Sequence, residues 1–311
     1  MPLDPNVKAI LDEMAAQGGP ALNEVSPEAA REMFREMELS GEPEPVEAVE
    51  DRTIPGPAGE IPIRVYTPKG DTPLPVLVFF HGGGFVIGDL ETHDAECRAL
   101  ANAADCIVVS VDYRLAPEHK FPAALDDAFA ATEWVASNAS AIGADPNRIA
   151  VGGDSAGGSL ATVVSQMAKD RGGPRLAFQL LVYPPTQYGF DTASHAENAD
   201  GYFLTRDMMD WFLAQYFTGE VDGSDPRISP LRTADLSGLP PALVITAEFD
   251  PLRDDGEAYA ARLAEAGVPA KNTRYDGMIH GFFSMAALLP QARQAIDEAA
   301  EALREAFAAV E

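Results

Sequence analysis

A glycine-rich stretch at residues 150–161, AVGGDSAGGSLA, matches two kinds of catalytic loop. Gly153, Ser155 and Gly157 form G-x-S-x-G, a pattern in which a sharp strand-to-helix turn exposes a serine hydroxyl as a nucleophile. The same stretch resembles a phosphate-binding loop, G-x-x-x-x-G-K-[ST], but Gly158 stands where that loop needs its lysine. The stretch therefore predicts a nucleophile, Ser155.

A serine hydroxyl becomes a good nucleophile only when a base accepts its proton and a third group orients that base. Of the five histidines, His280 in GMIHGFF follows the last predicted strand and lies in a loop with nearby glycines. Asp250 directly follows the strand before it, whereas Glu248 and Asp254 are interpreted as structural acids. We expect Ser155, Asp250 and His280 to meet at one edge of a sheet.

Acyl transfer also needs hydrogen-bond donors for the negatively charged oxygen of the tetrahedral intermediate. The segment HGGGF at 81–85 follows a predicted strand, and its glycines allow backbone N–H groups to converge. We predict that Gly83, Gly84 and the N–H of Ala156 form this oxyanion hole. His81 is expected to brace the loop.

The elements that must position these residues alternate between strands and helices from residue 46 onward, which indicates an α/β sheet. The predicted strands cover 46–54, 61–67, 76–80, 107–113, 148–153, 178–183, 242–248 and 271–276. The predicted helices between and after them cover 95–104, 122–139, 159–170, 255–267 and 291–310. The first two strands flank the turn signal PGPAGE and form a predicted antiparallel hairpin.

Two segments do not fit this alternation. Residues 1–45 predict two short helices, the second covering 28–39 after an N-cap serine and a proline. The second segment, about 186–225, contains a predicted helix at 201–217 that is rich in aromatic residues and methionine. Together they could form a lid over the carboxyl edge of the sheet, where α/β folds bind ligands. The predicted domains are cap helices at 1–45 and a catalytic domain at 46–311 with the second segment as a cap insertion.

Five motifs, HGGGFVIGD, DYRLAPEHKFPAAL, GGDSAGGSLA, DPLRDDGEAYAARL and HGF, resemble the bacterial hormone-sensitive-lipase-like carboxylesterases, lipolytic family IV. The resemblance covers nearly the whole chain. It implies an α/β-hydrolase fold with a mostly parallel eight-stranded sheet, flanking helices and a helical cap. It also implies hydrolysis of short to medium acyl-chain esters without a cofactor. Its site residues match those reached above: Ser155, Asp250, His280, Gly83, Gly84 and Ala156.

The substrate pocket is expected to be formed by apolar cap residues together with two phenylalanines of the core. The predicted residues are Phe34, Phe203, Leu204, Met208, Met209, Phe212, Phe85 and Phe282. Apolar walls favour neutral acyl chains. Two alternatives remain: an amidase or deacetylase that uses the same three residues, and a non-catalytic ligand receptor, which should have lost one of them.

Composition and the placement of apolar residues and cysteines limit the expected location of the protein and its metal content. Hydrophobic residues make up 46% of the 311 residues, as in ordinary globular proteins, and the longest apolar runs are strand-sized. We therefore predict no membrane insertion, and an N-terminus without a secretory pattern predicts a cytoplasmic protein. Cys97 and Cys106 are too far apart in sequence for a redox or zinc pair, so we predict free, buried thiols and no metal. The protein could be a monomer or a homodimer.

The chain carries 49 acidic and 22 basic residues, a net charge of −27. This charge repels nucleic acids and anionic lipid surfaces, which excludes both as predicted partners. It also makes the folded chain repel itself. Adaptation to a salty environment is one hypothesis for this excess, and ordinary acidic solubility is the other.

Salt adaptation predicts that the melting temperature rises between low and molar NaCl. Dissolved ions shorten the screening length from roughly 10 Å at 0.1 M to 3 Å at 1 M and so weaken the self-repulsion. Thermal unfolding followed by circular dichroism over this range tests the hypothesis, and a melting temperature that does not rise contradicts it.

Overall fold

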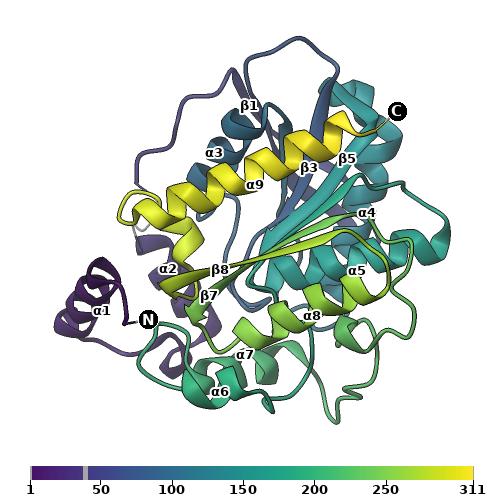
Figure 1. Cartoon of the computed structure of the whole chain (residues 1–311). Coiled ribbons are helices and arrows are strands. Elements are labelled where there is room, and N and C mark those ends of the chain that lie inside the picture. The colour runs from purple at the N-terminus through teal and green to yellow at the C-terminus, as the bar shows by residue number, and fades with distance from the viewer. Residues whose placement is uncertain (1, 38–40, 311) are drawn as a thin grey trace.

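An eight-stranded sheet forms the centre of the computed structural model, which describes residues 2–37 and 41–310 (Figure 1). The strand order is β1-β2-β4-β3-β5-β6-β7-β8. The strands are β1 Ala48–Gly56, β2 Gly59–Thr67, β3 Leu74–Phe80, β4 Ile107–Val111, β5 Ala144–Asp154, β6 Phe178–Val182, β7 Ala242–Phe249 and β8 Ala270–Ile279. Strands β3 to β8 run parallel to one another, whereas β2 is antiparallel to both β1 and β4. The mostly parallel sheet and its opening hairpin are confirmed.

Helices cover both faces of this sheet, which explains why the central strands are continuous apolar runs. The covering helices are α3 Asp94–Ala104, α4 Ala123–Asn138, α5 Ala156–Arg171, α8 Arg253–Glu265 and α9 Pro290–Ala308. Alternate residues of β3 face two separate cores, because successive side chains of a strand point to opposite faces. Val78 packs in the core that includes α4, α5 and α8, and Phe79 packs in the core that includes α3 and α9.

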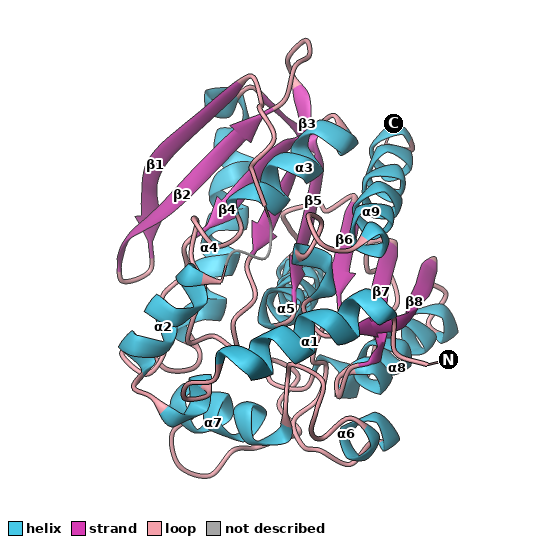
Figure 2. Ribbon diagram, turned by 90° about the vertical axis from the view of Figure 1, so that its left-hand side faces the viewer, coloured by secondary structure: helices cyan, strands magenta, loops and turns pink. Residues whose placement is uncertain are grey.

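Four further helices gather at the end of the molecule where the parallel strands finish (Figure 2). They are α1 Pro5–Gln17, α2 Pro27–Glu36, α6 Ala193–Glu197 and α7 Arg206–Tyr216, and the short 3-10 helix η1, Leu22–Glu24, packs against α7. The N-cap side chain of Ser26 accepts a hydrogen bond from the Ala29 N–H at 3.3 Å, so α2 begins where the sequence predicts. The division of the chain into a cap and a catalytic domain stays a prediction.

Several predicted helix bounds differ from the structure by a few residues, and α7 and α2 are two examples. The helix predicted at 201–217 begins only at Arg206, because Thr205 caps it by accepting from the Met208 N–H at 3.2 Å and Phe203 has a φ of 64°. The helix predicted to reach Leu39 ends at Glu36. Residues 38–40 lie outside the described part of the chain.

Both cysteines are free and buried, as predicted. Within residues 2–37 and 41–310, no helix has the length and apolar character needed to cross a membrane. These findings leave the sheet, its two cores and the helices above its carboxyl edge as the frame for a site.

The turn from β5 into α5 depends on how closely α5 approaches the end of β3. A Cβ atom placed on Gly157 would overlap the backbone carbonyl of Phe80, and one on Gly153 would meet the same oxygen. Both neighbours are backbone, so neither can move aside as a flexible side chain could. Only glycine lets the first turn of α5 lie directly over the end of β3.

We therefore expect Gly157→Ala to lower the free energy of unfolding by about 3 kcal/mol or more, the upper range for overpacking. Gly172→Ala is a matched control, because Gly172 closes α5 at a φ of 75° but has open space around its Cα. That control should cost about 1 kcal/mol from its backbone conformation alone. Urea unfolding of the two variants measures the difference, and equal losses would contradict the steric argument.

Candidate active site

Ser155 stands at the turn between β5 and α5 in a strained backbone conformation, with φ 51° and ψ −120°. Positive φ is uncommon for a residue with a side chain and is kept only where the surroundings enforce it. Here the Ser155 N–H donates to the Val182 carbonyl on β6 at 2.8 Å, while Gly157 allows α5 to fold back immediately. The result places the Ser155 side chain on the wall of a large cavity.

The imidazole of His280 connects Ser155 to Asp250. Its Nε2 lies 2.9 Å from Ser155 Oγ, and its Nδ1 lies 2.8 Å from Asp250 Oδ2. Asp250 is fully buried, and its Oδ1 accepts from the Leu252 N–H at 2.8 Å. With Nδ1 protonated and donating to Asp250, Nε2 can accept the proton of the serine hydroxyl. The structure thus brings the three predicted residues into one hydrogen-bonded chain.

Strand ends position the base and the acid. Asp250 follows β7 directly, as the sequence predicts. The last strand is longer than predicted: β8 continues beyond residue 276 to Ile279, after a register irregularity against β7 between Ala247 and Phe249. His280 is therefore the first residue after β8, and Gly281 at a φ of 81° turns the chain away behind it.

The predicted oxyanion residues lie beside Ser155 on the same cavity wall. Gly83 and Gly84 have φ values of 114° and 59°, and a Cβ on Gly84 would overlap the Phe212 ring. The structure pairs none of the N–H groups of Gly83, Gly84 and Ala156 with an acceptor from residues 2–37 or 41–310. Three amides near a serine hydroxyl and without acceptors form an arrangement that could receive a negatively charged oxygen.

His81 supports the 81–85 loop through its contacts with Tyr113 and Gly82. Its ring stacks on Tyr113 with 4.3 Å between centroids, its Nδ1 lies 2.7 Å from the Gly82 carbonyl oxygen, and the Tyr113 hydroxyl donates to the His81 carbonyl at 2.6 Å. Burial lowers the pKa of His81 to about 4, so the ring is neutral at pH 7. These contacts agree with a bracing role.

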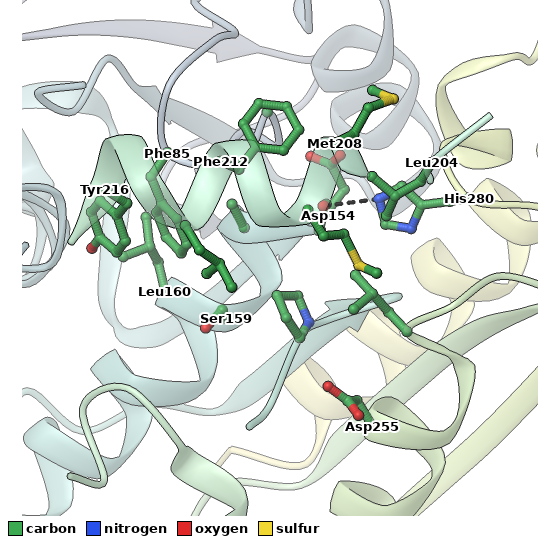
Figure 3. Close-up of a pocket in the computed structure, with 18 of the residues that line it drawn as sticks. Phe85, Asp154, Ser159, Leu160, Leu204, Met208, Phe212, Tyr216, Asp255 and His280 are labelled. Carbon is green, nitrogen blue, oxygen red and sulfur yellow. Dashed lines mark hydrogen bonds between the residues drawn. The ribbon is translucent and has the colours of Figure 1, made fainter. Parts of the chain in front are cut away.

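Seven of the eight predicted pocket residues line the cavity. They are Phe34, Phe85, Phe203, Leu204, Met208, Met209 and Phe212. Figure 3 shows Phe85 beside Tyr216 at one end, and Leu204 and Met208 near His280 at the other. The prediction for Phe282 is wrong: the short helix η4, Phe282–Ser284, turns this ring into the core, where it is fully buried 5.1 Å from the Tyr275 ring.

Sequence reasoning missed several residues of the cavity wall. Tyr216 stacks on Phe85 with 4.0 Å between centroids, and its place in the aromatic stretch 201–217 was the available signal. A polar group at another part of the wall combines Gln187, His195 and Asp255. Burial raises the pKa of Asp255 to about 8, although Gln187 Nε2 donates to its Oδ1 at 3.2 Å and favours the charged form. No sequence pattern distinguishes this carboxyl from its neighbour at 254.

Comparison with known proteins identifies the family of this fold. A family model described as an alpha/beta hydrolase fold matches residues 77–284. The chain belongs to the α/β-hydrolase family, in its hormone-sensitive-lipase-like group. Within the described residues of this α/β hydrolase, no three or more histidine, cysteine or acidic side chains gather as metal ligands would.

The relatives match this α/β hydrolase along almost its whole length. It is 46% identical to the carboxylesterase NlhH of Mycobacterium tuberculosis, over 98% of this chain and 96% of the relative. It is 40% identical to an arylesterase of Saccharolobus solfataricus, over 91% and 92%. An ester hydrolase from the metagenome of Lake Arreo superposes with a TM-score of 0.96 at 47% identity, over 98% of this chain and 99% of that one. A hyperthermophilic esterase from the archaeon Pyrobaculum calidifontis gives 0.94 at 48% identity, over 98% and 99%.

Proposed function

We propose that this protein is a serine carboxylesterase that hydrolyses short to medium acyl-chain esters through a covalent acyl-enzyme. Its enzyme class is carboxylic ester hydrolase, as in the relatives that it matches over nearly all of its length. The observation that carries the proposal is the His280 imidazole, with Nε2 2.9 Å from Ser155 Oγ and Nδ1 2.8 Å from Asp250 Oδ2. Cofactor-free chemistry is part of the proposal.

In the first step, Ser155 Oγ attacks the ester carbonyl carbon while His280 Nε2 accepts the hydroxyl proton. Asp250 holds the Nδ1–H tautomer and stabilises the imidazolium that forms. The carbonyl oxygen becomes an oxyanion and accepts hydrogen bonds from the N–H groups of Gly83, Gly84 and Ala156. The tetrahedral intermediate then breaks its bond to the alcohol oxygen, which leaves with the proton from His280.

The second step repeats this chemistry with water. His280 accepts a proton from a water molecule, whose oxygen attacks the acyl carbon bound to Ser155. The same three N–H groups hold the second oxyanion. When this intermediate collapses, Ser155 Oγ takes the proton from His280 and the free carboxylic acid departs. The enzyme returns to its starting state.

The cavity wall supports the proposed substrate class. An aromatic ring from α2, and aromatic rings and thioethers from α7, line the cavity that contains Ser155, and Phe85 and Tyr216 stack on its wall. Such a wall binds neutral acyl chains through burial rather than charge. The helices above the carboxyl edge would act as the cap that selects the substrate. Cytoplasmic location, a monomeric or homodimeric state and salt adaptation stay predictions.

Ser155→Ala should abolish hydrolysis of p-nitrophenyl butyrate, with kcat lower by roughly 10⁴-fold or more, because the nucleophile is missing. His280→Ala should lose a similar amount, since triad residues act as a unit. Release of p-nitrophenolate measures both, and circular dichroism checks the fold. Ser165→Ala is the matched control: this serine lies on the same helix and donates to the Ala161 carbonyl, away from His280. Retained activity in Ser155→Ala would refute the nucleophile assignment.

A series of p-nitrophenyl esters from acetate to palmitate tests the proposed chain length. We expect kcat/KM to be highest for short to medium chains and to fall for long ones, which the cap would hinder. The matched p-nitroanilide of butyric acid tests the amidase alternative. Faster cleavage of the anilide than of the ester would replace the carboxylesterase proposal with an amidase, and binding without any cleavage would favour a receptor.

A further inference from the structure

A second carboxylate–imidazole pair, Asp154 with His93, lies beside the turn between β5 and α5, which we call the elbow. Asp154 directly precedes the nucleophile Ser155. His93 Nε2 lies 3.3 Å from Asp154 Oδ1, and the two side chains are only 3% and 7% exposed. The same Asp154 oxygen accepts from the Gly82 N–H at 2.7 Å. Asp154 therefore ties the first glycine of the 81–85 loop to the elbow, and His93 holds Asp154 in place. The proposed ester hydrolysis does not itself use this pair.

A further contact on α3 connects this pair to the segment that follows His280. Glu96 lies one turn along α3 from His93 and is also buried. Its Oε2 accepts from the Ser284 hydroxyl at 2.6 Å, and Ser284 lies in η4, four residues after His280. The start of α3 thus contacts three segments: the 81–85 loop through Asp154, the elbow, and the segment after His280.

The titratable and charged groups that face His93 are Asp154, Glu96, Asp89 and the neutral ring of His81. Burial disfavours a charged His93, but the attraction and hydrogen bond of Asp154, helped by Glu96 and Asp89, outweigh it and raise the pKa of His93 to about 9. Charged His93 in turn lowers the pKa of Asp154. At pH 7 the pair is therefore an ion pair.

Loss of the proton from His93 would give Gly82 a second acceptor. His93 Nδ1 lies 2.9 Å from Thr92 Oγ1, which can keep the Nδ1 proton in place. Nε2 then carries a lone pair, and it lies only 3.4 Å from the Gly82 N–H. Asp154 would meanwhile be left as a buried carboxylate without its cation, which is strongly unfavourable. The Nε2 lone pair and the Asp154 carboxylate oxygen, 3.3 Å apart, would then repel each other on either side of the Gly82 N–H, which would displace Gly82 from its present position.

We infer that His93, Asp154 and Glu96 form a positioning network that fixes the oxyanion loop against the elbow and the His280 segment, and that protonated His93 is its active form. The inference rests on the proposed esterase function. A shift of Gly82 moves the next two amides, which must meet the oxyanion, and displacements of about 1 Å at such a site cost roughly a hundredfold in rate. Turnover should then fall at alkaline pH as His93 loses its proton.

The test is the pH profile of kcat for p-nitrophenyl butyrate between pH 6 and 10.5, corrected for uncatalysed hydrolysis. We expect wild-type kcat to fall on an alkaline limb near pH 9 with little change in KM. His93→Gln keeps a donor toward Asp154 but cannot titrate, so the alkaline limb of the kcat profile should disappear in this variant. His93→Phe offers no donor, and its kcat should be roughly tenfold below that of His93→Gln at pH 7.5. A His93→Gln profile with the wild-type limb overturns the inference.

Glu96→Gln provides an independent variant that keeps His93. Removing this negative charge should lower the pKa of His93 and move the limb to lower pH. Glu91→Gln is its matched control, because that carboxylate is 68% exposed and pairs with Arg64. A limb at the same pH in Glu96→Gln and Glu91→Gln also overturns the inference. This comparison stays decisive if His93→Phe does not fold.

Stoichiometric reaction with a p-nitrophenyl alkylphosphonate separates the network from the proposed function. Ser155 Oγ bonds to phosphorus while p-nitrophenolate leaves with the electrons of the broken P–O bond, so one equivalent is released without ester turnover. The network predicts the same alkaline limb in this rate, and its loss in His93→Gln. Phosphonylation with this limb but without cleavage of any carboxylic ester would refute the esterase proposal while supporting the network. A rate independent of His93 overturns the network alone.

Discussion

The close contact between the first turn of α5 and the end of β3 is the constraint on which the site depends. Gly157 lets the helix backbone lie against the Phe80 carbonyl, and this forces Ser155 into its positive φ. The same turn exposes the Ala156 N–H and directs the Asp154 carboxylate toward Gly82. One steric arrangement therefore positions the Ser155 nucleophile, the Ala156 N–H donor and the Asp154 carboxylate that holds the 81–85 loop. Strain in a single residue is kept because packing on all sides over-determines it.

Two carboxylate–imidazole pairs flank this strained turn, and they differ in what surrounds them. His280 contacts the serine hydroxyl through Nε2 and faces the cavity, so it can exchange a proton with a bound ester. His93 turns its Nε2 toward a carboxylate and a backbone amide instead. The same two residue types can thus move protons on one side of the elbow and hold a loop on the other. Both rings line the same cavity, so the contact of His280 with the serine hydroxyl separates the two roles.

Much of this arrangement could be predicted from sequence because parallel strands finish at one edge. Asp250 and His280 could be chosen among many acids and five histidines since each follows a predicted strand. The cavity wall could not be predicted as well, because helix periodicity does not say what a helix packs against. Phe282 follows His280 closely, yet the η4 turn places its ring in the core, whereas Tyr216 lines the cavity and stacks on Phe85. The aromatic stretch 201–217 marks Tyr216 as a candidate, but it does not show which ring Tyr216 stacks on, and no sequence pattern marks the turn at Phe282.

The acidic composition makes the oxyanion site harder to build, since a nearby free carboxylate would oppose a developing negative charge. Three buried carboxyl groups in and beside the cavity are each compensated in a different way. Asp250 bonds to His280, and Asp154 bonds to Gly82 and pairs with His93. Asp255 is buried, and desolvation raises its pKa to about 8, which favours its neutral form at pH 7. A chain with a net charge of −27 can therefore stabilise an anion, because Asp250 and Asp154 beside Ser155 are paired and Asp255 in the cavity wall favours its protonated form.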